Sequence, residues 1–110
     1  MTKNNIINSI FVVRLAWAAA GRCYQCSSRN LLCGVTVNAT LKIDSTPCNG
    51  QCYTRLNRND ENTIYRGCSW EHGFMSVQQK NLLILDSNSV WIFCDTAFCN
   101  DDATALFNSK

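Results

Sequence analysis

Eight cysteines constrain this chain more than any other feature. All of them lie between Cys23 and Cys99 in a sequence of 110 residues. An even number of cysteines in a short chain is typical of paired disulfides, and disulfides form in oxidising compartments. One domain of this length buries too little surface for a large hydrophobic core. The sequence therefore predicts a single small domain that is stabilised by disulfides.

The first 21 residues are predicted to be a secretory signal peptide. Lys3 precedes an apolar run over residues 10–17, and the small residues 18–21 supply a cleavage site. Arg14 interrupts the run, which leaves two other interpretations open: an amphipathic N-terminal helix and a wrongly assigned start. The run is too short for a transmembrane span, and no other stretch is long enough.

The charges give no indication of a nucleic-acid partner. From Arg22 onward there are eight Lys or Arg residues and eight Asp or Glu residues, so the mature part is near neutral. A surface that binds nucleic acid needs a basic patch, and the sequence has no long run of like charge.

A C-x-x-C motif, here Cys23 and Cys26, occurs in zinc sites, in redox centres and at the ends of different disulfides. Zinc ribbons repeat the motif, but the later pairs have the spacings C-x-x-x-C and C-x-x-x-x-C. A redox centre needs a helix after the motif, and no helical period follows Cys26. The only histidine, His72, has no neighbouring metal-type ligand, so we expect neither a metal nor a cofactor.

Strands fit the sequence better than helices. Residues 51–56 and 62–67 are rich in β-formers and flank a polar turn at 57–61, which predicts a hairpin. Residues 89–93 are predicted to be a further strand that leads into Cys94. The apolar run at 82–85 is too short for its period to distinguish a strand from a helix.

Five motifs together resemble one family. They are Cys23-Tyr24-Gln25-Cys26-Ser27-Ser28, Cys33, Cys48-x-x-x-Cys52, Arg66-Gly67-Cys68-Ser69 and Cys94-x-x-x-x-Cys99-Asn100. In these residues the chain resembles the lymphocyte-antigen-six/urokinase-receptor family, within it the invertebrate sleepless (quiver) branch. The resemblance covers residues 22–100 and implies a small disulfide-rich all-β domain of the three-finger (snake-toxin-like) type. The amide of Asn100 can fold back and tie the end of the chain to the strands beside it.

The resemblance also implies a disulfide pairing, whereas eight cysteines alone allow about a hundred pairings. The implied pairs are Cys23–Cys52, Cys26–Cys33, Cys48–Cys68 and Cys94–Cys99. Relatives usually have two further cysteines, which pair with each other in the third finger, and Phe93 stands at the position of one of them. Three loops, at residues 27–47, 53–67 and 69–93, are expected to leave the disulfide cluster, with no deep pocket between them.

The function that the resemblance implies is that of an extracellular binding protein. Such a protein, a monomer, modulates a membrane ion channel or receptor, either a potassium channel or a nicotinic acetylcholine receptor, and so regulates neuronal excitability or sleep. Two alternatives stay open: a freely secreted toxin-like or carrier-like factor, and a cytosolic cysteine-rich metal or redox protein. Catalysis on a small-molecule substrate is not expected, because a nucleophile needs a base and His72 is more simply part of a turn.

Two further features concern modification and attachment. Asn38-Ala39-Thr40 is the only N-glycosylation sequon, and a secretory route favours a glycan on Asn38. Residues 101–110 are predicted to be a short polar tail in which Asp101 and Asp102 are solvated. Relatives commonly carry a glycolipid anchor, whose signal needs a hydrophobic tail. We therefore expect a secreted protein, or one attached to the outer face of the plasma membrane if a longer form carries that signal.

The third loop is predicted to carry the partner-binding surface. It contains Phe74, Met75 and the run 82–85, and alternate residues of a strand point to opposite faces. We expect Leu83 and Leu85 to bind a membrane protein or lipid, assisted by Arg55 and Arg58 at the polar tip of the second loop. The alternative is that the whole run packs on the central hairpin and replaces the missing disulfide.

Overall fold

The computed structural model describes residues 19–72 and 78–108. These residues form an all-β structure with two short 3-10 helices and no α-helix. The strands are β1 (Gly21–Tyr24), β2 (Cys26–Ser27), β3 (Ser45–Cys48), β4 (Cys52–Asn57), β5 (Thr63–Cys68), β6 (Ile84–Asp86) and β7 (Ser89–Cys94), and the 3-10 helices are η1 (Ser69–His72) and η2 (Thr104–Asn108). Residues 1–18 of the predicted signal peptide lie outside the described residues, as do Phe74 and Met75.

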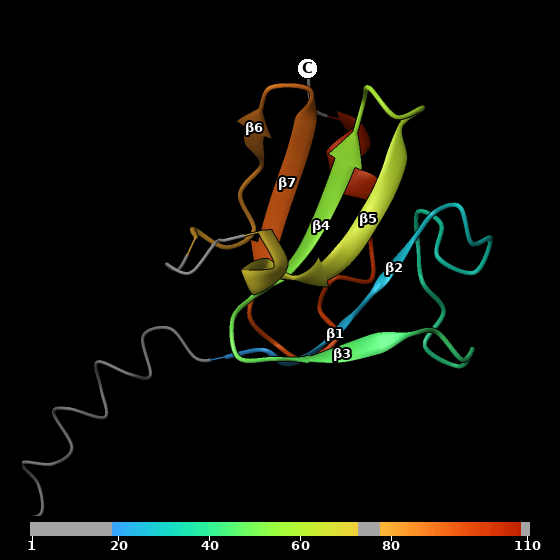
Figure 1. Ribbon diagram of the computed structural model, residues 1–110, viewed down its shortest axis with the longest axis vertical. Helices are drawn as coiled ribbons and strands as arrows, with labels where there is room; N and C mark the ends of the chain where they lie inside the picture. Colours follow the sequence, from blue (N-terminus) through green and yellow to red (C-terminus); the bar gives the residue numbers. More distant parts are fainter. Residues whose placement is uncertain (1–18, 73–77, 109–110) are drawn as a thin grey trace, which may run out of the picture.

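The strands are arranged in two antiparallel sheets (Figure 1). β1 pairs only with β3, and the other five strands form a sheet in the order β2-β5-β4-β7-β6. A single residue, Gln25, separates β1 from β2, so the chain passes directly from the small sheet to the large one. The small disulfide-rich all-β fold that the sequence predicts is therefore confirmed.

The predicted central hairpin is confirmed to within one residue. β4 pairs with β5 from Cys52 opposite Cys68 to Asn57 opposite Thr63. β7, which confirms the strand predicted at 89–93, pairs with the other edge of β4 from Cys52 opposite Cys94. β4 is thus the middle strand of the large sheet and has a strand on both sides.

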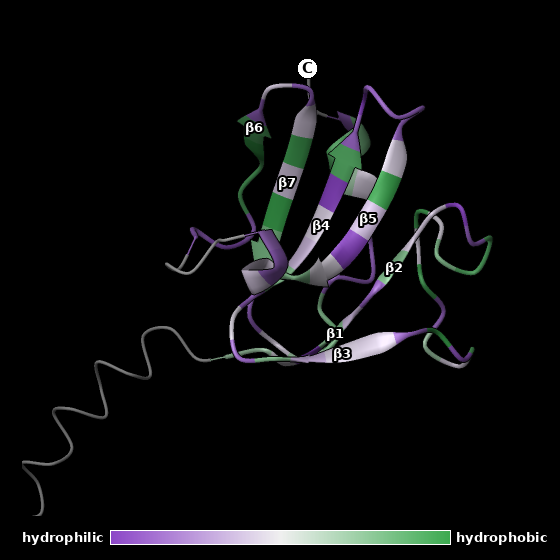
Figure 2. Cartoon of the chain, viewed as in Figure 1, coloured by the Kyte–Doolittle hydropathy of each residue, from purple (hydrophilic) through white to green (hydrophobic). Residues whose placement is uncertain are grey.

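Both faces of the large sheet carry buried apolar side chains. Hydrophobic bands on β4, β5 and β7 are separated by polar or neutral ones (Figure 2). Leu56, Ile64 and Val90 pack together on one face, which we call the aliphatic face. Tyr53, Trp91 and Phe93 pack together on the opposite face, which we call the aromatic face. Each face therefore has a separate small core.

η2 covers the aliphatic face and corrects the prediction of a polar tail. Ala103 and Leu106 are fully buried against Leu56 and Val90. The segment is held by a backbone hydrogen bond of 2.8 Å from the Ala103 amide to the Val35 carbonyl. Asp101 and Asp102 are exposed, as predicted. The prediction was wrong for Ala103 and Leu106, because isolated apolar residues in a polar setting show no period, although both are needed to close this core.

The two residues before Arg22 already belong to the folded part. Ala20 is 6% exposed, packs against the disulfides and donates a hydrogen bond of 2.9 Å to the Gly50 carbonyl. Gly21 is the first residue of β1 and lies opposite Cys48.

We expect Leu106→Ala to lower the free energy of unfolding by about 2–4 kcal/mol, because it leaves a cavity under the aliphatic face. Phe107→Ala is the matched control, since Phe107 is 46% exposed. This substitution should lower the free energy of unfolding by less than about 1 kcal/mol. Urea denaturation of the two variants measures both values. Equal losses of stability would show that η2 does not cover the sheet in the way described.

Candidate interaction site

The four disulfides in the structure are the same pairs that the family resemblance implies: Cys23–Cys52, Cys26–Cys33, Cys48–Cys68 and Cys94–Cys99. Three of these bridges gather at one end of the domain in a single apolar cluster. All eight cysteines are paired, so none remains as a thiolate ligand for zinc or as a redox thiol.

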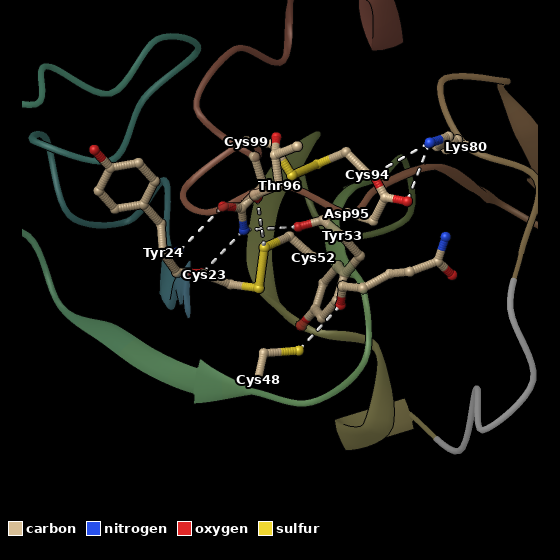
Figure 3. Close-up of a disulfide and its surroundings, with 12 residues drawn as sticks. Cys23, Tyr24, Cys48, Cys52, Tyr53, Lys80, Cys94, Asp95, Thr96 and Cys99 are labelled. Atoms are coloured by element: carbon tan, nitrogen blue, oxygen red, sulfur yellow. Dashed lines mark hydrogen bonds and ion pairs between the residues drawn. A yellow bond between two sulfur atoms is a disulfide. The ribbon is translucent and has the colours of Figure 1, made fainter. Parts of the chain in front are cut away.

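Figure 3 shows disulfides of this cluster with Tyr24 and Tyr53 beside them. The side chain of Asn100 connects these two tyrosines to the end of the chain. It is 1% exposed. Its Oδ1 accepts a hydrogen bond of 3.1 Å from the Tyr24 amide, and its Nδ2 donates to the carbonyls of Tyr24 at 3.0 Å and Tyr53 at 3.1 Å. The prediction that Asn100 ties the end of the chain to the neighbouring strands is therefore confirmed.

Arg66 makes a second buried connection on the aliphatic face. It is 2% exposed, and it donates to the carbonyls of Asn100 at 2.7 Å, Cys33 at 3.2 Å, Val35 at 2.9 Å and Asp101 at 3.3 Å. Burial lowers the pKa of Arg66 to about 10, so the guanidinium stays charged at neutral pH. It therefore fixes the end of the first loop and the segment after Cys99 to the centre of the sheet.

The first loop presents apolar side chains that the sequence analysis did not identify. Leu31 is 94% exposed and Leu32 is 44% exposed. The loop nevertheless has a defined turn, because Asn30 accepts a hydrogen bond of 3.0 Å from the Leu32 amide through its Oδ1 and one of 2.8 Å from the Cys33 amide through its carbonyl. The two adjacent leucines in the short segment between Cys26 and Cys33 were the feature of the sequence that could have indicated this exposed apolar surface. We call Leu31 and Leu32 the leucine tip.

An ion pair joins the first loop to the turn of the central hairpin. Arg29 donates to both carboxylate oxygens of Asp60, at 2.8 and 2.7 Å, and to the hydroxyl of Tyr65 at 3.0 Å. The Tyr65 hydroxyl in turn donates to Asp60. Hydrogen bonds from Tyr65 and Arg29 lower the pKa of Asp60. Exposed ion pairs contribute little stability, but this bidentate geometry limits how the leucine tip can move against the hairpin.

The structure corrects the prediction for the third loop. β6 begins only at Ile84, and the two middle residues of the run 82–85 are partly buried on opposite faces of the sheet. Leu83 packs on the aliphatic face and Ile84 on the aromatic face. Leu82 is 48% exposed and Leu85 is 60% exposed. The prediction that both Leu83 and Leu85 point outward was therefore wrong for Leu83 and right for Leu85. The alternative, in which the whole run packs on the central hairpin, is wrong as well.

The two arginines predicted at the tip of the second loop have different positions. Arg55 lies in the middle of β4, where its guanidinium is 5.0 Å from the ring centre of Trp91 and 5.7 Å from that of Tyr65. Its Nε donates to Ser89 at 2.9 Å. Arg58 is exposed in the turn after β4. Only Arg58 is therefore at the tip, and the structure does not bring Arg55 together with Leu83 or Leu85 in one surface.

His72 is exposed at the end of η1, as expected of a turn residue, and its ring lies against the aromatic face. Its Nε2 is 3.0 Å from the Tyr53 hydroxyl, and its ring meets those of Tyr53 and Trp91 edge-on at 5.0 and 5.2 Å. Burial, followed by the charge of Arg55, lowers the pKa of His72. Burial and the charge of Glu71 raise the pKa of Tyr53, so its hydroxyl stays protonated at neutral pH. This contact holds η1 against the sheet and supplies no activated nucleophile.

Asn38 is exposed on the first loop. Its Oδ1 accepts hydrogen bonds from the Thr40 amide at 2.9 Å and from the Thr40 hydroxyl at 2.7 Å. The sequon therefore forms a surface turn in which Asn38 and Thr40, the two residues that define it, are in contact. Within the described ranges, no group of three or more His, Cys, Asp or Glu residues could hold a metal ion.

Comparison with known proteins finds no match to a family model, a curated protein or a solved structure. No helix in the described part of the chain is long and apolar enough to cross a membrane. Four disulfides in so short a chain are typical of secreted and extracellular proteins.

We expect the stability of the domain to fall as the pH drops from about 7 to about 5, because the unfolded chain protonates His72 more readily than the folded domain does. The pKa of His72 is below its usual 6.5 in the folded state, so this stability is present above pH 6.5 and is lost below it. Asp60 and Asp102 have pKa values below the usual 3.8 and lose their stabilisation only in more acidic solution.

The measurement is the thermal unfolding midpoint of the wild type and of His72→Asn across this pH range. The variant should show a smaller decrease between about pH 7 and pH 5. The same slope in both proteins would mean that His72 is equally solvated in the folded and unfolded states.

Proposed function

We propose that this chain is an extracellular three-finger protein that binds a membrane ion channel or receptor and modulates it. The support is threefold: the four disulfide pairs, the cluster of bridges at one end, and loops that leave this cluster with exposed apolar side chains. A potassium channel or a nicotinic acetylcholine receptor is the target class, and regulation of neuronal excitability or sleep is the role. The proposal includes a cleaved signal peptide, a glycan on Asn38 and no enzymatic activity.

A three-finger domain without its third-finger disulfide needs another means of fixing that loop. Phe93, at the position of one absent cysteine, is fully buried and stacks on Trp91 with the ring centres 5.9 Å apart. Its carbonyl accepts a hydrogen bond of 2.8 Å from the Asn81 amide. Gln51 and Gln78 also exchange two hydrogen bonds, at 2.9 and 2.8 Å, between the backbone of Gln78 and the side chain of Gln51. Apolar stacking and amide hydrogen bonds thus take the place of the third-finger disulfide.

The leucine tip is the observation that carries the proposal. Leu31 exposes almost its entire side chain, although water exposure of a leucine gives no stability to the fold. The loop that carries it is fixed by the Cys26–Cys33 disulfide, by Arg66 and by the pair of Arg29 with Asp60. An apolar residue on a fixed loop loses little conformational entropy on binding, which favours its use as an interface anchor.

The test uses current recordings from cells that express a voltage-gated potassium channel or a nicotinic acetylcholine receptor, with and without the protein. We expect the wild type to change the current amplitude or kinetics. The double variant Leu31→Ser, Leu32→Ser should be secreted normally, since neither side chain is in a core, and should lose most of the effect.

Leu82→Ser, Leu85→Ser is the matched control, because these two leucines are also exposed but lie in the third loop. It should retain the effect if the leucine tip is the binding surface. Loss of the effect in this control alone would show that the binding surface is on the third loop. No effect of the wild type on either class of target would contradict the proposed function.

A further inference from the structure

A polar hollow of about 330 Å³ lies between the turn of the central hairpin and the turn between β6 and β7. Its lining includes Asn57 and Asn59 from the first turn, Asp86 and Asn88 from the second, and the side chains of Arg55 and Trp91 below them. We call it the tip hollow. Its volume is at the lower end of the range for sites that hold small ligands.

The two turns are held together by the backbone, so the hollow is a fixed feature. Asn57 and Ser89 are paired residues of β4 and β7. The Arg58 amide donates to the Asn88 carbonyl at 2.9 Å and so connects the two turns directly. The second turn has only two residues between its strands, and Ser87 takes a left-handed conformation with φ of 56°. The turns therefore need little rearrangement when a ligand binds.

The polar groups that line the hollow are available to a ligand. Among the residues that the structure describes, no hydrogen-bond or ion-pair partner is found for the side chains of Asn59, Asp86 and Asn88. The Asn57 side chain uses its Oδ1 to accept from the Asn59 amide at 3.0 Å, which leaves its two Nδ2 donors. The hollow thus offers amide donors and acceptors together with one carboxylate.

We propose that the tip hollow binds the terminal neutral hexose of a glycan. A hexose presents neighbouring hydroxyl groups, each of which both donates and accepts. A carboxylate and side-chain amides are planar groups that can bond to two such hydroxyls at once. The lining contains one cation, Arg55, and one anion, Asp86, so its formal charge is zero and it offers no net attraction to an acidic ligand. The apolar floor at Trp91 is narrow, because this side chain is 5% exposed and lies under the Arg55 guanidinium.

This inference goes beyond the proposed function. The tip hollow is on the second and third loops and contains neither leucine of the leucine tip. Glycans are present on proteins of the extracellular space, where the four disulfides place this chain. A glycan on a membrane partner would give a second, weak contact beside that of the leucine tip.

The test uses the full secreted chain carrying Asn38→Gln, so that a glycan of its own cannot compete. Calorimetric titration compares a mannose-terminated N-glycan with a sialic-acid-terminated N-glycan of equal branching. We expect the mannose-terminated glycan to bind and the sialylated one to bind at least tenfold more weakly. Asp86→Ala and, separately, Asn88→Ala should each weaken binding at least fivefold, and both residues are exposed, so the fold should persist.

Asn49→Ala is the control, since Asn49 is an exposed asparagine between β3 and β4, away from both turns. It should bind like the parent, and the thermal unfolding midpoints should show that all variants are folded. Asn59→Ala replaces any variant that does not fold. Three results would each overturn the inference: no binding of either glycan, stronger binding of the sialylated glycan, or unchanged binding in the hollow variants. Because the probes are free glycans, these outcomes do not depend on the leucine tip.

Discussion

The buried guanidinium of Arg66 and the buried amide of Asn100 attach the end of the chain to β1, β4 and β5, and no disulfide makes these attachments. Arg66 reaches the first loop and the segment after Cys99, and Asn100 reaches β1 and β4. A buried charge is costly unless its donors are satisfied, and here backbone carbonyls from four residues satisfy them. These carbonyls come from loops that have no pairing strand, so one side chain supplies the hydrogen bonds that a sheet would otherwise provide.

This arrangement explains how a small domain can have two cores and still expose leucines. β4 has strands on both sides and apolar residues on both faces, so each face needs its own cover. η2 covers the aliphatic face, and η1 with His72 contacts the aromatic face. The loops are then fixed by bridges and hydrogen bonds rather than by burial of their own side chains. Their ends are exposed, with the leucine tip on one loop and the tip hollow between the other two.

The sequence predicts the frame of this structure well and its surfaces poorly. The hairpin of β4 and β5 follows from β-formers around a polar turn. Asn100 ties the end of the chain to the neighbouring strands, as its short amide side chain indicates. The resemblance supplies the cysteine pairs, which spacing alone leaves open. Leu83 was misplaced because the sheet buries apolar side chains on both faces, so a residue that points away from one core enters the other. Leu106 and the role of Arg66 depend on tertiary neighbours, which no local pattern encodes.

The disulfide pairing tests the account most directly, since the cores, the loops and both proposed surfaces depend on it. The measurement is peptide mapping by mass spectrometry of the unreduced, secreted protein. The account predicts Cys23–Cys52, Cys26–Cys33, Cys48–Cys68 and Cys94–Cys99, with no free thiol. A bond between Cys23 and Cys26, or reactive thiols in the folded protein, would contradict it.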